Sequence, residues 1–441
     1  MIRIRKLGDL TAGERKSILE RAEEQVRLAL EPAKKVLDDV RACGDDALLE
    51  HTLRFDEVAL ARKTMRLSKG EIDEAYGRVD GRLLAALKHA HRNITRFHRK
   101  QMPKPMWMKM EPGVEGGRLV VPVESAGLYV PGGKAFYPSV MLMLAVPAKV
   151  AGVERVVACT PPRRDGRLDP ASIVAADISG VDEVYKVGGV QSIAAMAYGT
   201  ETIKKVDVIA GPGSPYVSAA QRLVKLDVRM DFPAGPSEGM VLADSKANPK
   251  YVAADVLSEA EHGPDSAGVL VTDSMRLAKK VAAEIRPMIE ALPEVRRRYV
   301  RHNMATYSII IVADTMDEAI GFVNEYAAEH LVINTKDPKK TLKKIMNAGT
   351  ICLGGFTPIT AGNFIVGPNA ILPTGGYARQ FSGVSVDTFL KKPTVEYVTR
   401  KGLGKLAKDI ILLSDFEGFP AHSNSVKVRL KSTYSTLKGG V

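Results

Sequence analysis

The stretch "EVYKVGGVQSIAAMAYGTETIKKVDVIAGPGSPYVSAAQRLV" (183–224) alternates short β-branched runs with segments of helix length. Its runs at 183–189 and 205–213 predict strands, and the segments that follow each of them predict helices. The same rhythm extends back to about residue 118 and forward to about residue 238. Because strands joined through helices lie parallel in one sheet, this region predicts a doubly wound parallel sheet in an α/β fold.

A second α/β unit follows, with strand-like runs such as "GMVLAD" and "AGVLVTD" and a long predicted helix that ends near residue 298. Two Rossmann-like halves are therefore expected. Residues 12 to about 100 carry apolar side chains at helical spacing. After about residue 386 the patterning is weak, and it ends in the basic, strand-like "VKVRLKSTYS".

These patterns predict four parts of the chain. They are an N-terminal helical tail (1–25), a discontinuous first α/β domain (26–117 plus 239–385), a second Rossmann-like domain (118–238) and a small C-terminal domain or arm (386–441).

Composition narrows the class of partner. The formal net charge is +12, but the basic residues are dispersed and aromatic residues are not interleaved with them, so no nucleic-acid partner is expected. The N-terminus has no apolar segment of signal-peptide type, and the longest apolar stretch is broken by Pro147 and Lys149, so no membrane span is expected. Three widely spaced cysteines fit a reducing cytoplasm.

Glycines gather where the predicted strands of the first sheet end, in "PGG", "VGG", "GPG" and "AGP". One such loop is ordinary turn chemistry. Four in a row at the carboxyl edge of a parallel sheet favour a ligand crevice, because glycine lets backbone N–H groups approach a phosphate or substrate.

Three of the eight histidines lie at predicted element ends with carboxylates nearby. Glu259 and His262 are three residues apart and share a helix face, which suits a surface hydrogen bond or a pair of metal ligands. Glu329 and His330 lie where a helix meets an apolar strand, and they suit either a helix-terminal cation or an acid/base pair. Glu417 and His422 form the third group.

Taken together, these stretches resemble the histidinol dehydrogenase family over most of the chain. The motifs that carry the resemblance are "GLYVPGGKAFYPSVMLMLAVPAKVAGV", "VGGVQSIAAMAYGT", "DVIAGPGSPYV", "DFPAGPSE", "LSEAEHGPDS", "AAEHL", "NAGTICLG" and "EGFPAH". The resemblance implies a cytoplasmic homodimer of amino-acid biosynthesis that uses NAD and one zinc ion per site. It also implies that the C-terminal unit reaches into the site of the partner subunit.

The resemblance also assigns residues. Tyr129 and Gln191 match cofactor contacts, and Glu329 and His330 match the acid/base pair. By this likeness His330 takes the alcohol proton, and Glu329 activates the water that hydrates the aldehyde. The positions that match substrate contacts are Ser237, Glu259, His262, His330, Asn363, Glu417 and His422.

Four positions depart from the family pattern. The family binds zinc through glutamine, histidine, aspartate and histidine; here the set is Glu259, His262, Asn363 and His422, so amide and carboxylate have exchanged places. The exchange keeps the formal ligand charge, and a zinc site is retained. Ser214 replaces a cofactor-contacting asparagine. Ala370 replaces a substrate-contacting histidine, which leaves one substrate group without that partner.

The sequence thus predicts an NAD-dependent, zinc-assisted dehydrogenase that oxidises a small polar primary alcohol through the aldehyde to the carboxylate, with L-histidinol as the nearest named substrate. Two alternatives stay open. One is a relative that acts on another alcohol, such as a dihydroxypropanesulfonate, and the other is a non-catalytic ligand-binding relative.

Overall fold

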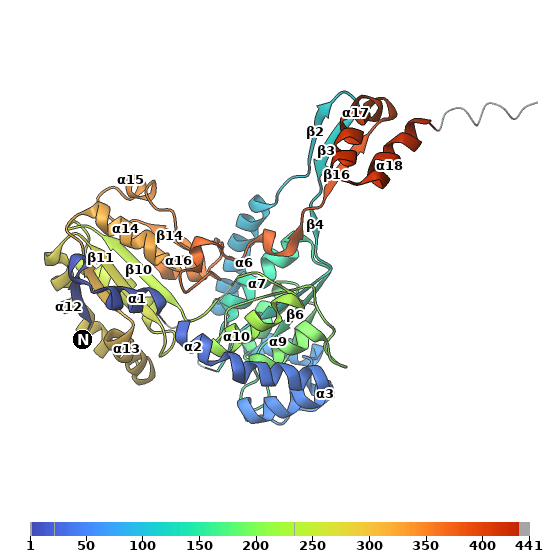
Figure 1. The fold of residues 1–441 in the computed structure, drawn as a ribbon. Coiled ribbons are helices and arrows are strands. Elements are labelled where there is room, and N and C mark those ends of the chain that lie inside the picture. The colour runs from blue at the N-terminus through green and yellow to red at the C-terminus, as the bar shows by residue number, and fades with distance from the viewer. Residues whose placement is uncertain (1, 22, 134, 233, 432–441) are drawn as a thin grey trace, which may run out of the picture. The chain divides into compact units, whose positions relative to one another are not determined.

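The computed structural model describes residues 2–21, 23–133, 135–232 and 234–431 (Figure 1). The chain divides into two compact units, one of residues up to 102 plus 123–389 and one of 103–122 plus residues from 390 onward. Among the described helices, none is both long and apolar enough to cross a membrane.

The first unit contains a five-stranded parallel sheet with the strand order β7-β6-β5-β8-β9. Its strands are β5 (Ser125–Tyr129), β6 (Arg155–Cys159), β7 (Glu183–Tyr185), β8 (Val208–Ala210) and β9 (Arg229–Met230). In chain order this is 3-2-1-4-5, the doubly wound order, and the direction of winding reverses between β5 and β8. The predicted parallel sheet is confirmed.

Helices cover both faces of this sheet. The helices α9 (Gly189–Tyr198) and α10 (Pro215–Leu223) pack on one face, and α7 (Pro138–Ala151) and α8 (Pro170–Ile178) pack together on the other. These helices are rich in alanine and short aliphatic side chains, which allow close packing on strands that are buried on both faces.

The helical region before residue 102 belongs with this sheet, whereas the sequence pattern assigns it to the other α/β domain. The long helix α3 (Leu30–Asp56) buries Ala33, Leu37 and Val40 against α9 and α10. The amphipathic pattern predicts the helix but does not say which sheet covers its apolar face. The rest of the region is α2 (Glu23–Leu28), α4 (Arg62–Met65), α5 (Lys69–Arg78) and α6 (Gly81–Gln101).

The first unit also holds a six-stranded parallel sheet with the order β1-β12-β11-β10-β13-β14. Its strands are β1 (Arg3–Lys6), β10 (Glu238–Ala243), β11 (Ala267–Thr272), β12 (Ile309–Val312), β13 (His330–Asn334) and β14 (Thr350–Leu353). The last five repeat the 3-2-1-4-5 order. The sequence pattern misses β1, because "RIRK" is short, charged and outside any apolar run.

Side chains of the six-stranded sheet alternate between two cores. Val241 faces α11 (Pro249–Ala260), α12 (Met275–Glu290) and α13 (Glu294–Thr306), and Met240 faces α14 (Met316–Tyr326) and α1 (Ala12–Glu20). The predicted long helix to residue 298 is wrong, since the chain breaks at Pro293 and forms α12 and α13. Shorter helices follow at α15 (Pro338–Leu342) and α16 (Ile359–Phe364), with 3₁₀ turns at residues 7–9, 224–226, 377–379 and 386–389.

The second unit has a three-stranded antiparallel sheet of order β16-β3-β2 and a two-stranded ribbon of β4 and β15, followed by α17 (Arg400–Phe416) and α18 (Pro420–Lys431). The strands are β2 (Met106–Glu111), β3 (Val114–Arg118), β4 (Val121–Pro122), β15 (Leu390–Lys391) and β16 (Thr394–Val398). Residues 103–117 therefore group with the C-terminal part and not with the first α/β domain, because β2 and β3 pair with β16.

The strand predicted at "VKVRLKSTYS" is also wrong for residues 426–431, which continue α18. Ser423 and Val426 are its buried residues, a helical spacing of three that is hidden by the alternation of apolar and basic residues after Val426. Residues 432–435 of that prediction lie outside the described residues.

Candidate active site

Two of the three predicted carboxylate–histidine groups belong to the first unit and lie close together there. Glu329 and His330 lie at the start of β13, and Glu259 is in the last turn of α11, which returns the chain to the start of β11. Ser237 directly precedes β10, the strand between β11 and β13. These residues therefore gather at the amino edge of the six-stranded sheet, the opposite edge from the one where an open α/β sheet usually binds ligands.

Glu259 is the central group of this site. Its side chain is 1% exposed; Oε2 lies 3.0 Å from Nε2 of His262, and Oε1 accepts a hydrogen bond of 3.0 Å from the amide nitrogen of Asn363. The predicted proximity of Glu259 and His262 is thus observed, although α11 ends at Ala260 and His262 lies in the turn that follows. Asn363 comes from α16, so a segment about a hundred residues later in the chain completes the group.

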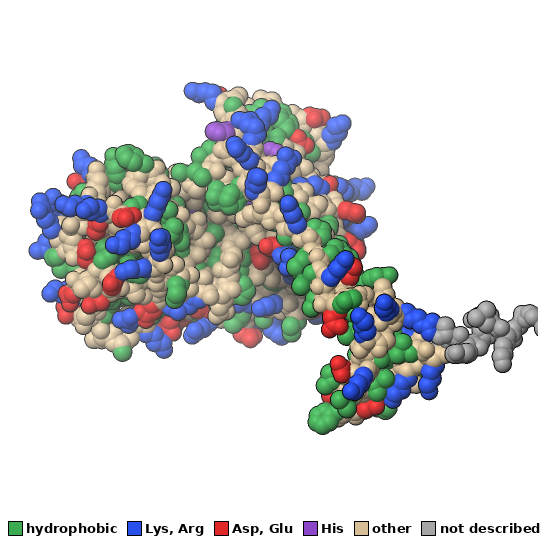
Figure 2. All heavy atoms as spheres, turned by 90° about the horizontal axis from the view of Figure 1, so that it is seen from above, with side chains coloured by type: hydrophobic (Ala, Val, Ile, Leu, Met, Phe, Trp, Pro, Cys, Tyr) green, Lys and Arg blue, Asp and Glu red, His purple; other side chains and the backbone are tan. Residues whose placement is uncertain are grey.

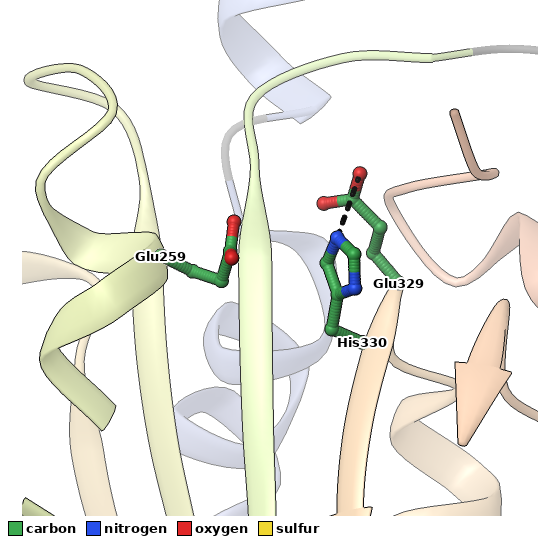
Figure 3. A group of neighbouring side chains, drawn as sticks. All are labelled: Glu259, Glu329 and His330. Atoms are coloured by element: carbon green, nitrogen blue, oxygen red, sulfur yellow. Dashed lines mark ion pairs between the residues drawn. The ribbon is translucent and has the colours of Figure 1, made fainter. Parts of the chain in front are cut away.

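Glu329 and His330 lie beside Glu259. Nε2 of His330 is 3.7 Å from Oε1 of Glu329, and both side chains are buried. Figure 3 shows the His330 ring and the Glu329 carboxylate turned toward each other on one side of the strand β10, with the Glu259 carboxylate across it. Each of the three residues offers an atom within 4.8 Å of the other two, a spacing that suits a shared cation or a shared proton.

Burial shifts the proton affinities of this pair in opposite directions. Desolvation raises the pKa of Glu329 well above its ordinary value, and the charge of Glu259 raises it further, against one backbone hydrogen bond that lowers it. Desolvation lowers the pKa of His330, although Glu259 opposes the shift. His330 is therefore a neutral imidazole near neutral pH and is able to accept a proton.

The donor set fits a divalent metal ion. Glu259 offers a carboxylate and His262 an imidazole, and Oδ1 of Asn363 is buried without a hydrogen-bond partner among the described residues. An amide oxygen left unpaired beside a buried carboxylate is an unsatisfied acceptor, and such atoms are uncommon unless a ligand occupies the site.

The predicted cofactor contacts lie at the other sheet. Tyr129 ends β5, Gln191 is in the first turn of α9, and Ser214 caps α10 by accepting a hydrogen bond of 3.4 Å from the Val217 amide. All three are at the carboxyl edge, around the point where the winding reverses. Gly211 allows the close approach there: its φ is +135°, and a Cβ atom would lie 2.1 Å from the carbonyl oxygen of Tyr129.

A pocket of about 440 Å³ opens at the same edge, lined by the loops that follow β5 and β6 and by Asp56. Gln191 is 1% exposed; its Nε2 donates to Asp56 at 3.5 Å, while its Oε1 has no partner among the described residues. Burial raises the pKa of Asp56 to about 6. The sequence reading did not single out Asp56; its position at the end of an amphipathic helix gives no local signal.

The remaining predicted site residues are Glu417, His422 and Ala370. Glu417 caps the C-terminal end of α17 and His422 is in the first turn of α18, both with exposed side chains on the second unit. Ala370 is partly buried in the chain that follows α16. Their roles stay predictions.

The sequence reading also missed Glu238 and Arg21. Glu238 begins β10, is 2% exposed, and donates its backbone N–H to Oε2 of Glu329 at 2.9 Å. The Arg21 side chain is 7% exposed and pairs with Glu238. A signal existed for Glu238, because it is a lone acidic residue that opens an otherwise apolar strand, "EGMVLA". Arg21 lies in a charged helical stretch that gives no such sign.

Comparison with known proteins bears on this geometry. The family model described as histidinol dehydrogenase matches residues 19–430. The chain is 45% identical to the histidinol dehydrogenase of Synechocystis sp., over 97% of this chain and 99% of that protein, and 46% identical to that of Methanothermobacter thermautotrophicus, over 94% and 96%. A crystal structure of histidinol dehydrogenase from Elizabethkingia anophelis superimposes with a TM-score of 0.90 at 37% identity and covers 98% of both chains. With this agreement of sequence over nearly the full length and of fold, the chain belongs to the histidinol dehydrogenase family.

Proposed function

We propose that this protein oxidises L-histidinol to L-histidine through the aldehyde, with two molecules of NAD. The observation that carries the proposal is the buried group of Glu259, Glu329 and His330, in which a neutral imidazole and a carboxyl of raised pKa face each other. Family membership supplies the substrate. The balanced reaction consumes one alcohol, two NAD⁺ and one water, and yields one carboxylate, two NADH and three protons.

When bound, NAD would supply the hydride acceptor for both oxidations, and zinc held by Glu259, His262 and Asn363 would supply a Lewis acid that polarises the substrate oxygen. The remaining tasks in the reaction are performed by side chains of the protein. Their tasks are to hold the alcohol, to remove its proton, to activate water and to keep bulk solvent away.

His330 acts as the general base in the first step and takes the alcohol proton on Nε2, the ring atom that faces Glu329. Its lowered pKa keeps this nitrogen free to accept the proton near neutral pH. The burial that lowers this pKa also excludes water from the reacting carbon.

Glu329 activates the water that adds to the aldehyde. A carboxyl group of raised pKa is a stronger base once ionised than an ordinary surface carboxylate, so it is better suited to remove a proton from water. The Glu238 amide holds one oxygen, Oε2, and the other, Oε1, is directed at His330. The two residues can therefore pass the proton between them.

Tyr129, Gln191 and Ser214 bind NAD at the carboxyl edge of the five-stranded sheet. The proposal rests on the pocket of about 440 Å³ at this edge and on the unpaired Oε1 of Gln191. The reversal of winding between β5 and β8 is the usual dinucleotide position in such sheets.

For the metal, we propose Glu259, His262 and Asn363, with His422 contributed by a second copy of the chain in a homodimer. Ser237 and Glu417 would contact substrate. The second unit supports the dimer, since large hydrophobic side chains lie on its surface (Figure 2), among them Trp107, Met110, Leu413 and Phe416. Exposed apolar side chains of this size on so small a unit are typical of a protein–protein interface. Light scattering that gave a monomer would contradict this part of the proposal.

Two further parts of the proposal concern location and layout. Cys43, Cys159 and Cys352 are all free, which fits a reducing cytoplasm. Of the four predicted parts of the chain we retain the Rossmann-like domain at 118–238, because it contains all five strands, β5 to β9, of one parallel sheet.

The test is NAD⁺ reduction by the zinc-loaded protein with L-histidinol and, in parallel, other primary alcohols including dihydroxypropanesulfonate. Two NADH for each histidinol consumed would support the proposal and show that Ala370 is tolerated. Turnover of another alcohol with histidinol inert would contradict it and would mean that the chemistry is kept while substrate recognition has changed. If no alcohol reacts, the non-catalytic alternative stands.

A further inference from the structure

Arg21 lies immediately after α1 in an unusual backbone conformation. Its φ is +53° and its ψ is −126°, and it is one of the three non-glycine residues with positive φ in the part of the chain that the structure describes. A non-glycine residue in such a conformation costs on the order of 1–3 kcal/mol and persists only where the surroundings hold it. The contacts of the Arg21 side chain are therefore expected to hold this backbone conformation.

The Arg21 side chain is buried and makes three contacts with the wall of the active site. Nε lies 2.6 Å from Oε2 of Glu238, a terminal nitrogen donates to the carbonyl oxygen of Tyr326, and the guanidinium carbon lies 3.5 Å from the centroid of the Tyr326 ring. Burial alone would lower the pKa of Arg21, but Glu238 and Tyr326 outweigh it, so the pKa is raised and the group stays charged.

These contacts lead to Glu329 by one further step. Glu238 donates its backbone N–H to Oε2 of Glu329 at 2.9 Å, while its own Oε1 accepts the Gly375 amide at 3.0 Å. Tyr326 ends α14, three residues before Glu329. Arg21 thus fixes both the residue that donates to Glu329 and the helix that leads into it.

We propose that Arg21 is a positioning residue, which acts through Glu238 to hold the Glu329 carboxylate where it can activate water. The inference rests on the proposed function of Glu329 and deepens it. If Arg21 were lost, Glu238 would be an unpaired buried carboxylate, and the start of β10 would shift to bring it to solvent. A displacement of about 1 Å in a catalytic group can cost roughly a hundredfold in rate.

The chain offers a matched control in the same segment. Glu23, two residues after Arg21, accepts hydrogen bonds of 2.5 and 2.8 Å from the two terminal nitrogens of Arg222, and the Arg222 and Glu23 side chains are 25% and 18% exposed. This pair anchors the N-terminal segment to α10, and among the described residues its hydrogen bonds join neither Glu238 nor Glu329, although the pair lines the same pocket as Glu238. Arg222→Gln therefore loosens the segment without the proposed link.

The experiment is a single turnover of L-histidinol with zinc-loaded enzyme in excess, in which the first and second NADH appear as separate phases. The variants are Arg21→Gln, Arg21→Lys, Glu238→Gln, Arg222→Gln and the double variant Arg21→Gln/Glu238→Gln. The first phase needs His330 and the second also needs the water that Glu329 activates. Loss of a residue that positions Glu329 should therefore slow the second phase alone, whereas loss of a residue that only stabilises the fold should not distinguish the two phases.

We expect Arg21→Gln to slow the second phase by about 10- to 100-fold with the first phase within about twofold of wild type. Arg21→Lys, which keeps the charge but not the fork of donors, should recover part of the loss. The double variant leaves no unpaired buried charge and should be less impaired than the two single losses added together. Arg222→Gln should lower the melting temperature and leave both phases unchanged.

Equal slowing of both phases, or an unchanged second phase, would overturn the positioning role. If Arg21→Gln does not fold, the same comparison is made with Arg21→Lys and with the double variant. Failure of the proposed function has a different signature, since wild-type enzyme would then give no NADH from histidinol at all.

Discussion

Replacing Asn363 by aspartate would place a second carboxylate against Glu259. Oε1 of Glu259 now accepts a hydrogen bond of 3.0 Å from the Asn363 amide, inside a site where Glu259 is 1% exposed. Asn363→Asp changes one nitrogen to oxygen and keeps the size of the side chain. The hydrogen bond would become a repulsion between like charges.

The size of this repulsion follows from two limits. At 3.0 Å and an effective dielectric constant of about 20, two negative charges repel by about 5.5 kcal/mol. The introduced carboxyl can instead take up a proton, and for an ordinary aspartate with a pKa of about 3.9 this costs about 4 kcal/mol at pH 7. Proton uptake costs less than the repulsion, so we expect the introduced carboxyl to be protonated in the folded state. The free energy of unfolding of the metal-free variant should therefore fall by at most about 4 kcal/mol at pH 7 and about 1.5 kcal/mol at pH 5.

The assay is thermal unfolding of the metal-free protein between pH 5 and pH 8, followed by the same series with zinc. The introduced carboxyl has a raised pKa in the folded state, so its stability contribution is present at low pH and is lost as pH rises. The melting temperature of Asn363→Asp should therefore fall below that of the control Asn363→Ala as pH rises. Zinc should reverse the order, because two carboxylates and an imidazole bind a divalent ion well.

The double variant Glu259→Gln/Asn363→Asp moves the single carboxylate to the other side of the pair and should recover most of the metal-free stability. If Asn363→Asp were as stable as Asn363→Ala at pH 8 without metal, the two side chains would not face each other. The argument for an exchanged carboxylate and amide would then be wrong.

Three further outcomes are expected. Glu329→Gln should keep the first NADH of a single turnover and slow the second by about 10²-fold or more, and trapping of free aldehyde would confirm where the reaction stops. Asp255, on α11, has its pKa raised by burial to about 7. Between about pH 4 and 7 the native state holds a proton that the unfolded state has released, so the free energy of unfolding falls as pH rises across that window. Asp255→Asn should be more stable than wild type above pH 7, by up to about 4 kcal/mol. Denaturant unfolding should show that this difference becomes small near pH 4. Gln191→Ala should raise the KM for NAD about tenfold with the melting temperature nearly unchanged, and a calorimetric titration that found wild-type affinity would remove Gln191 from the cofactor site.

The parallel sheets were predictable because their strands are buried on both faces. Runs such as "GMVLA" and "AGVLVT" are almost wholly apolar, and the intervening helices carry their own period, so the two kinds of element are easily told apart. The partner of a helix is a different matter. The apolar face of α3 would fit either sheet, and only the folded chain selects α9 and α10.

The contacts within the site were predictable where the two residues lie close together in the sequence. Glu259 and His262 lie three apart, and the last turn of α11 with the turn that follows it brings their side chains within 3.0 Å. The link from Glu329 to Glu238 joins two strands 91 positions apart, and that from Arg21 to Glu238 crosses more than two hundred. No local pattern encodes such contacts, so residue type and spacing could not find them.

The carboxylates buried at the amino edge of the six-stranded sheet carry negative charge that a cation would neutralise. Glu238, Glu259 and Glu329 are 2%, 1% and 7% exposed, and Arg21 pairs with the first of them. Burial of a carboxylate without a cationic partner costs several kcal/mol. Protonation relieves this cost at Glu329, whereas Glu259 keeps the hydrogen bond from Asn363 and the contact with the His262 imidazole. A divalent ion at Glu259, or the ammonium group of an amino alcohol, would neutralise the negative charge that the protein's own side chains leave uncompensated. Binding of a cation at this site is therefore coupled to the stability of the fold. The cation should raise the melting temperature most at a pH where Glu329 is ionised. The rise should become smaller as the pH falls and Glu329 is protonated.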